Sequence, residues 1–238
     1  MKKIKVTKEY IFVNFVFITL IASAVFTIVR MSYAPTIAPP NIPGIRVKGY
    51  YVLMLLQCIL GVVAMLVPTF ISRRAHIKIP KDMFIVYAAF LYCAIYLGEV
   101  RSFYYIFPYW DSILHAFSGV ALGALGFSTI SLFNRRDTFP VNLSPFFVAM
   151  FAFCFAVMLG AIWEIYEFSI DAIFNTNMQK YALESGQQLV GRLALVDTME
   201  DIITDVLGAL TMAIVGYISI KYKKGWIEKI QLNFSSKN

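Results

Sequence analysis

Six long apolar blocks constrain this chain more than any other feature of its sequence. They lie at about residues 10–29, 50–71, 83–100, 112–133, 145–168 and 198–220. An α-helix of about 20 apolar residues spans the roughly 30 Å of hydrocarbon in a bilayer. The first block exceeds the apolar region of a cleaved signal peptide, about 7–15 residues, so we interpret it as an uncleaved anchor. The pattern predicts an all-α fold, a polytopic membrane bundle of about six transmembrane helices.

The composition favours a membrane bundle over a soluble domain. Hydrophobic residues make up 59% of the chain and charged residues only 15%, against about 25% charged residues in an ordinary soluble domain. The net charge of +7 comes from short basic clusters between the blocks, so we do not interpret it as a nucleic-acid surface. No Gly/Ser linker divides the sequence, which predicts a single transmembrane domain over residues 1–238.

The basic clusters also predict the orientation of the chain. If the N-terminus lies inside, six crossings place fifteen of the 21 Lys and Arg residues inside and six outside. This asymmetry follows the positive-inside rule, so we expect both termini in the cytoplasm of a cell whose plasma membrane the chain crosses. The six external basic residues are then Arg30, Arg46, Lys48, Arg101, Lys180 and Arg192.

Ionisable side chains within the last three blocks are the main functional signal, because such groups are costly in a membrane. They recur at helical spacings of three or four residues, which places them on common helix faces. All of them lie toward the outer side of a topology that was derived from Lys and Arg alone. We therefore predict a shared site at the outer ends of three helices. Its members are Asp111 and His115, Glu164 and Glu167, and Asp197, Asp201 and Asp205.

A divalent metal would explain why so many acids gather in one place. Carboxylates a few ångströms apart repel one another unless they are protonated, paired with cations or bound to a metal. Facing helices of a bundle commonly supply the ligands of such sites. Oxygen ligands with one His favour magnesium or manganese, and zinc stays an alternative. The predicted metal ligands are Asp111, His115, Glu164, Asp197 and Asp201.

Catalytic and supporting roles are assigned within the same set. We predict Glu164, Asp201 and His115 as the catalytic residues, and Glu99, Glu167 and Asp205 as their support. Arg101 or Arg192 would bind an anionic headgroup, because guanidinium groups match phosphate.

Simpler interpretations stay open for several of these residues. Asp111 and Asp197 stand at helix N-termini, where an acid caps free N–H groups. Glu99 and Arg101 end the third block on the same outer side, where a surface ion pair is the simpler interpretation. Gly119 and Gly123 are spaced for close helix packing.

Four segments between residues 97 and 216 carry a family resemblance. They are Gly98-Glu99, residues 110–119 (WDSILHAFSG), residues 163–167 (WEIYE) and residues 197–209 (DTMEDIITDVLGA). In these segments the chain resembles the YjdF-type uncharacterised membrane proteins and, more distantly, the VanZ-like family. The VanZ-like resemblance places Glu184, Gln187 or Gln188, Arg192, Asp201 and Asp205 at later positions of that family's pattern. Asp205 stands where the pattern usually has Asn. VanZ-like proteins are associated with glycopeptide tolerance, so this resemblance implies a lipid or envelope substrate.

These observations lead to one preferred function and two alternatives. The preferred hypothesis is a metal-dependent hydrolase or phosphatase that acts on a lipid or lipid-linked phosphate at the outer leaflet. The first alternative is a non-enzymatic protein that binds a lipid or an antibiotic at the envelope. A cation or proton transporter fits less well, because transport sites lie near the bilayer midplane and these acids crowd one side. The oligomeric state is left open.

Overall fold

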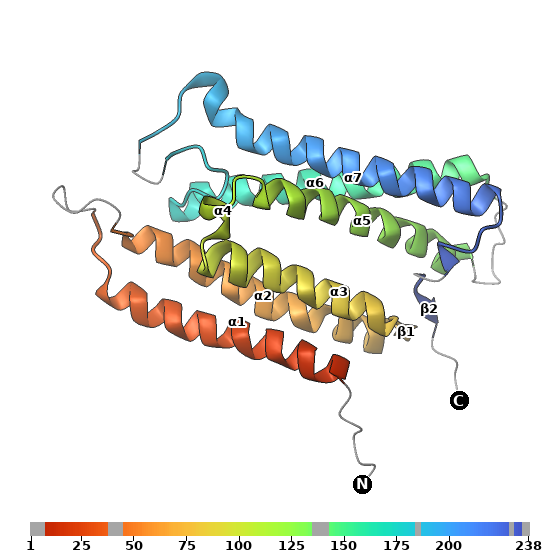
Figure 1. The fold of residues 1–238 in the computed structure, drawn as a ribbon, viewed down its shortest axis with the longest axis horizontal. Coiled ribbons are helices and arrows are strands. Elements are labelled where there is room, and N and C mark those ends of the chain that lie inside the picture. Colours follow the sequence, from red (N-terminus) through yellow and green to blue (C-terminus); the bar gives the residue numbers. More distant parts are fainter. Residues whose placement is uncertain (1–7, 38–44, 135–142, 184–186, 229–230, 235–238) are drawn as a thin grey trace, which may run out of the picture. The chain divides into compact units, whose positions relative to one another are not determined.

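The chain folds almost entirely into helices, as the computed structural model shows (Figure 1). The structure describes residues 8–37, 45–134, 143–183, 187–228 and 231–234. Two compact units can be distinguished, and each is described by itself. Unit 1 comprises Met1–Ala75 with Ile79–Pro108, and unit 2 comprises His76–Lys78 with Tyr109–Asn238. A single transmembrane domain over residues 1–238 stays a prediction.

Unit 1 is built from three long helical segments. These are α1 (Lys8–Tyr33), α2 (Lys48–Ala75), and α3 (Lys81–Leu91) with its continuation η1 (Tyr92–Val100), followed by the short α4 (Phe103–Ile106). Their shared core includes Leu20, Met54, Cys58 and Ile95. The segment η1 is a π-helix. This wider helix is rare in proteins overall, but it often occurs at functional sites.

Unit 2 is a bundle of three long helices, which run side by side in Figure 1. They are α5 (Trp110–Asn134), α6 (Pro145–Phe174) and α7 (Val196–Lys221), and the 3₁₀ turn η2 (Gly191–Leu195) leads into α7. Two short strands, β1 (Ile77–Lys78) and β2 (Asn233–Phe234), pair antiparallel with Ile77 opposite Phe234.

Local sequence signals define both ends of α6. The Ser144 hydroxyl accepts a hydrogen bond from the Phe147 amide at 3.2 Å, and Pro145 occupies the first turn. Both are favoured helix-start signals. At the other end Asn175 takes a left-handed conformation with φ 53°, which terminates helices. The helix therefore runs to Phe174, beyond the predicted end at residue 168, and it includes Asp171.

Within the part of the chain that the structure describes, six helical segments are long and apolar enough to cross a membrane, which confirms the predicted fold class. They span 20 to 31 residues each, so most extend a few residues beyond the predicted blocks. In α7 several large apolar side chains face outward, among them Ile203 and Leu207. Asp201 and Asp205 on the same helix are only 3% exposed. This arrangement of an apolar outside and a polar inside suits a lipid environment.

Small residues bring α5 and α7 into direct backbone contact. A Cβ atom added to Gly119 of α5 would collide with the backbone oxygen of Asp205. One added to Gly208 of α7 would collide with the backbone oxygen of Ala116. Close packing at Gly119, and at Gly123 against Met212, confirms the prediction from their spacing.

The orientation of the helices across the membrane can be tested by cysteine labelling. Gln187 lies in the connection before α7, and Lys224 follows its other end; both are exposed. We start from a variant in which Cys58, Cys93 and Cys154 are replaced by Ala. A cysteine at position 187 should react with an impermeant maleimide on intact cells, because the charge asymmetry places it outside. A cysteine at position 224 should react only after permeabilisation, and labelling of intact cells there would reverse the topology.

Candidate functional site

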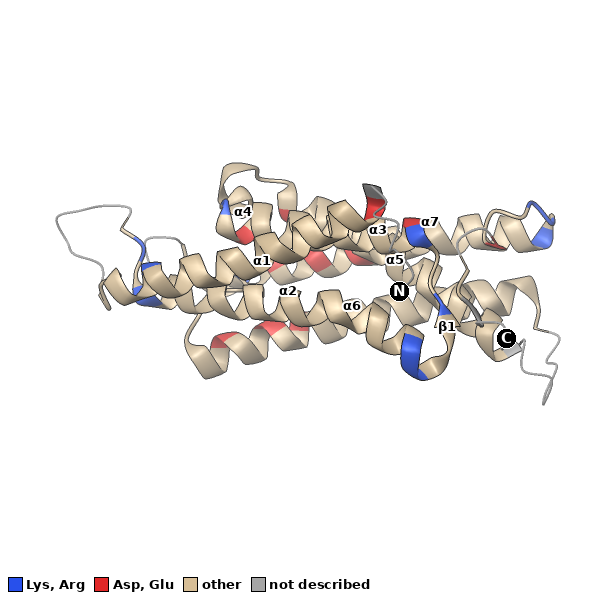
Figure 2. Cartoon of the chain, turned by 90° about the horizontal axis from the view of Figure 1, so that it is seen from below, with Lys and Arg blue, Asp and Glu red and all other residues tan. Residues whose placement is uncertain are grey.

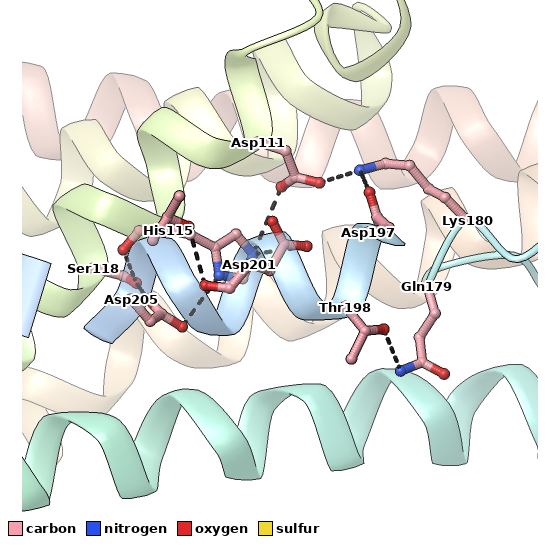
Figure 3. Close-up of polar contacts among 10 residues, drawn as sticks. Asp111, His115, Ser118, Gln179, Lys180, Asp197, Thr198, Asp201 and Asp205 are labelled. Atoms are coloured by element: carbon pink, nitrogen blue, oxygen red, sulfur yellow. Dashed lines mark hydrogen bonds and ion pairs between the residues drawn. The ribbon is translucent and has the colours of Figure 1, made fainter. Parts of the chain in front are cut away.

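The imidazole of His115 lies at the centre of a buried polar cluster between α5 and α7 (Figure 3). Its Nε2 atom is 3.7 Å from Asp111 Oδ1 and 3.8 Å from Asp201 Oδ2. On its other side, Nδ1 is 3.2 Å from Asp205 Oδ2. The ring is therefore surrounded by carboxylates of two helices, and its own exposure is only 8%.

Asp205 determines how His115 is presented. A carboxylate oxygen is a hydrogen-bond acceptor, so Asp205 Oδ2 is placed to accept a hydrogen bond from an N–H at Nδ1. Nε2 faces the carboxylates of Asp111 and Asp201. Ser118 holds Asp205 in turn, because its hydroxyl donates to Asp205 Oδ1 at 2.7 Å. This chain of contacts resembles the carboxylate–histidine pairs that orient metal-binding imidazoles.

Lys180 carries the positive charge that contacts this cluster. Its ammonium forms ion pairs with Asp111 Oδ2 and with Asp197 Oδ1, the latter at 2.8 Å. Burial alone would lower the pKa of Lys180, but the carboxylates of Asp111 and Asp197 outweigh it and raise that pKa above its ordinary value. The lysine therefore stays charged in the physiological pH range. Asp111 is shared, with Oδ1 toward His115 and Oδ2 toward Lys180.

The acids of α6 approach the cluster from a third helix. A Cβ atom on Gly160 would lie 2.6 Å from Asp205 Oδ2, so this face of α6 packs against the site. Glu164 and Glu167 follow one and two turns later on the same buried face. Since α6 and α7 run antiparallel, they approach the levels of Asp201 and Asp197. Glu164 accordingly interacts electrostatically with His115, Asp197, Asp205 and Asp111.

Glu164 has two buried carboxylate oxygens, and neither has a hydrogen-bond partner among the described residues. Its exposure is 4%. Asp197 also has one such oxygen, Oδ2. Buried carboxylates without partners are costly, so these oxygens mark the part of the site best suited to take up a cation or a proton.

Asp171 accepts hydrogen bonds from the turn that precedes Lys180. One carboxylate oxygen accepts hydrogen bonds from the Thr176 hydroxyl at 2.6 Å and from the Met178 amide at 2.7 Å. The other accepts from the Gln179 amide at 2.9 Å. The Gln179 side chain then donates to the Thr198 hydroxyl on α7 at 3.0 Å (Figure 3). These bonds tie the turn to both α6 and α7.

All of these groups lie toward one end of unit 2. The acids of α6 gather near its C-terminal end, and those of α7 lie in its N-terminal half (Figure 2). The cluster therefore lies between the three helices at a single end of unit 2.

Residues 12–222 match the family described as predicted membrane protein (DUF2238). The chain belongs to this family. The YjdF-type sequences are members of it as well, which confirms that part of the predicted resemblance. An uncharacterised protein of Thermotoga maritima is 27% identical over 151 residues, which are 63% of this chain and 69% of that protein. No solved structure matches the chain. This DUF2238 protein is thus a multi-pass membrane protein.

The structure brings most of the predicted site residues of this DUF2238 protein together. Asp111, His115 and Asp201 place three potential ligand atoms within 4.8 Å of one another. Asp205 contacts His115, Asp197 joins the group through Lys180, and the two α6 acids face it. The roles assigned to these residues stay predictions.

Of the three remaining predicted residues, two belong to unit 1 and one lies on η2. Glu99 is buried within unit 1, where the Tyr50 hydroxyl donates to its backbone oxygen at 3.4 Å. Arg101 is exposed in the same unit. Arg192 is exposed on η2, and it forms no ion pair within the described part of the chain. The predicted involvement of all three stays a prediction. Glu184, which the VanZ-like pattern included, lies outside the described residues.

Sequence reasoning missed Lys180, Ser118 and Asp171. Lys180 counted only as one external basic residue, although a single Lys in an external connection beside acid-bearing helices is a usable signal. Asp171 was missed because the predicted helix ended at residue 168. Ser118 offers no pattern of its own, since a helical serine commonly bonds to its own backbone.

We expect Asp171→Ala to destabilise the turn and the site together. The substitution leaves the Thr176 hydroxyl and two backbone amides without their acceptor, at a cost on the order of 2–4 kcal/mol in the free energy of unfolding. Thermal unfolding in detergent should show a clearly lower Tm than for the wild type. Ser169→Ala on the same helix removes a hydroxyl that bonds only to Ile165 of its own helix, and it should change Tm little. Equal Tm values for the two variants would contradict the role of Asp171.

Proposed function

We propose that this protein is a membrane-embedded, metal-dependent hydrolase that removes phosphate from a lipid or lipid-linked phosphate at the outer leaflet. The observation that carries this proposal is the presentation of His115. Asp205 holds Nδ1, and Nε2 faces Asp111 and Asp201, so a nitrogen and two carboxylate oxygens converge in a buried place.

The ligand set fits a small divalent cation. Octahedral Mg²⁺ has its ligands at about 2.0–2.1 Å, so neighbouring ligand atoms lie roughly 3 Å apart. The separations of 3.7 Å and 3.8 Å between His115 Nε2 and its two carboxylate partners need only small side-chain adjustments to reach this value. Oxygen ligands with one imidazole suit Mg²⁺ or Mn²⁺, and Zn²⁺ is the third candidate. A metal here would supply Lewis-acid polarisation of a phosphoryl oxygen and of a water molecule.

Glu164 is the residue best placed to act as general base. Its two buried oxygens lack hydrogen-bond partners within the described chain, so it can accept a proton from an attacking water. The water oxygen then bonds to phosphorus, and the phosphorus–oxygen bond to the lipid breaks. The leaving oxygen takes up a proton from solvent and departs as the lipid alcohol. Glu167 follows Glu164 on the same buried face of α6 and adds a second carboxylate there.

A phosphorylated lipid suits both the position and the surface of the site. The outer faces of α6 and α7 expose Ile165, Phe168, Ile203 and Leu207, so an acyl or isoprenoid chain can lie against them while its headgroup enters between the helix ends. The charge asymmetry of the sequence places these ends at the outer leaflet. Arg192, which is exposed on η2 of the same unit, would add a positive charge for the headgroup.

The main alternative is an envelope protein that binds a lipid or an antibiotic without turnover, as the distant VanZ-like resemblance suggests. It would use the same acids to hold a cation or a cationic ligand. Cation or proton transport is the weaker alternative, since the acids lie at one end of the bundle.

The metal content of the purified protein tests the proposed metal site directly. Purified wild-type protein should contain about one divalent ion per chain, and His115→Ala and Asp201→Asn should lose it. Asp205→Asn should weaken binding by about 10–100-fold, which is typical for the loss of a group that orients a metal-binding His. Glu200→Gln is the matched control, because Glu200 is an exposed acid beside Asp201. Equal metal content in wild type, His115→Ala and Asp201→Asn would argue for hydrogen bonding alone.

Turnover distinguishes the hydrolase from the binding protein. Phosphatidic acid, phosphatidylglycerophosphate and isoprenoid diphosphates are offered in detergent with Mg²⁺, Mn²⁺ or Zn²⁺, and phosphate release is measured. At least one should be cleaved in a chelator-sensitive manner. Glu164→Gln should lower kcat by at least about 10²-fold, because it removes the general base at constant volume. If the metal-loaded protein cleaves none of them, the binding function replaces the hydrolase.

A further inference from the structure

The Lys180 ammonium contacts the same carboxylate that faces the proposed metal site. Asp111 divides its two carboxylate oxygens, with Oδ1 toward Nε2 of His115 and Oδ2 toward the Lys180 ammonium. In two-metal hydrolytic sites the ions lie about 3.5–4 Å apart, and one carboxylate can serve both. Asp111 therefore has the geometry of a bridging ligand, with the proposed metal on one side and the lysine on the other.

The surroundings of the ammonium are those of a cation site. Asp197 contributes Oδ1 at 2.8 Å from Nζ, while its Oδ2 is buried without a hydrogen-bond partner among the described residues. Glu164, 96% buried with both oxygens unpartnered, faces the same cluster from α6. More carboxylate oxygens are thus available than a single ammonium can bind.

The backbone of the turn that contains Lys180 is held by hydrogen bonds, so the base of this long side chain has a defined position. Lys180 itself has a positive φ of 48°, a conformation that costs free energy for a residue other than glycine. Asp171 binds the two preceding amides, and Gln179 is tied to Thr198 of α7. Such a rigid arrangement delivers one positive charge to a defined point.

We propose that Lys180 is a tethered substitute for a second metal ion, which limits the centre to one divalent ion and supplies the second positive charge from the chain. This inference rests on the metal centre proposed above, and it does not depend on the identity of the substrate. In a hydrolase the ammonium would hold a phosphoryl oxygen opposite the metal. Asp197 then serves Lys180 and is not a ligand of the first metal ion, which differs from the role that its sequence position suggested.

The test is metal stoichiometry in full-length protein, measured by equilibrium dialysis against Mn²⁺ followed by elemental analysis. The wild type should bind about one ion per chain. Lys180→Ala frees the oxygens of Asp111 and Asp197, and it should bind about two. The combined Lys180→Ala and Asp197→Ala variant should return to about one, because the second position has lost its separate ligand. Asp197→Asn alone should keep one ion.

Controls and contrary outcomes separate this inference from the proposed function. Lys224→Ala removes an exposed lysine beyond the other end of α7, and it should leave the stoichiometry at one. Size-exclusion elution and helical circular dichroism report whether each variant folds. If Lys180→Ala does not fold, Lys180→Gln is measured in its place and should also bind a second ion. One ion in both the wild type and the folded Lys180 variant overturns the inference and leaves the metal centre standing. Two ions in the wild type also overturn it, and no ion in any variant removes the metal centre as well.

Discussion

The backbone contact between α5 and α7 is the constraint on which the rest of the site depends. Packed helices usually lie about 8–10 Å apart, and small residues at the interface bring them closer. Gly119 and Gly208 allow this closer approach. His115 lies one turn before Gly119, so its ring reaches two successive carboxylates of α7 at once. A larger residue at either glycine would separate His115 from Asp205, and the imidazole would lose the partner that orients it.

Several buried carboxylates lie close together, so their negative charges must be balanced by positive charge. The outer faces of α6 and α7 expose large apolar side chains, whereas four acids of the cluster, Asp201, Asp205, Glu164 and Glu167, are only 3% to 7% exposed. Ionised groups in such surroundings need partners. His115 and Lys180 contact some of these carboxylates. Both oxygens of Glu164 and one oxygen of Asp197 have no hydrogen-bond partner among the described residues. The proposed divalent ion follows from this imbalance together with the orientation of His115.

The connection between α6 and α7 contributes to the site as much as the helices do. Its turn begins with the left-handed Asn175 and is held by Asp171, which is 7% exposed and satisfied by three hydrogen bonds. Asp171 therefore has a structural role, although its type and position resemble those of the cluster acids. The difference is visible in its partners, since Glu164 has none of the described hydrogen bonds and Asp171 has several.

The sequence by itself determined the six helical spans and the faces on which Asp111, His115, Glu164, Asp201 and Asp205 lie. These properties are local, because hydropathy over about 20 residues and a repeat of 3.6 residues are complete within one segment. The contact of Lys180 with Asp111 joins residues 69 positions apart, and its contact with Asp197 joins residues 17 apart. Neither contact has a local pattern, since both depend on where α6 ends and how the following turn is tied. Only the tertiary structure decided which acids receive a partner and which stay unpaired, because pairing is set by the distances between helices.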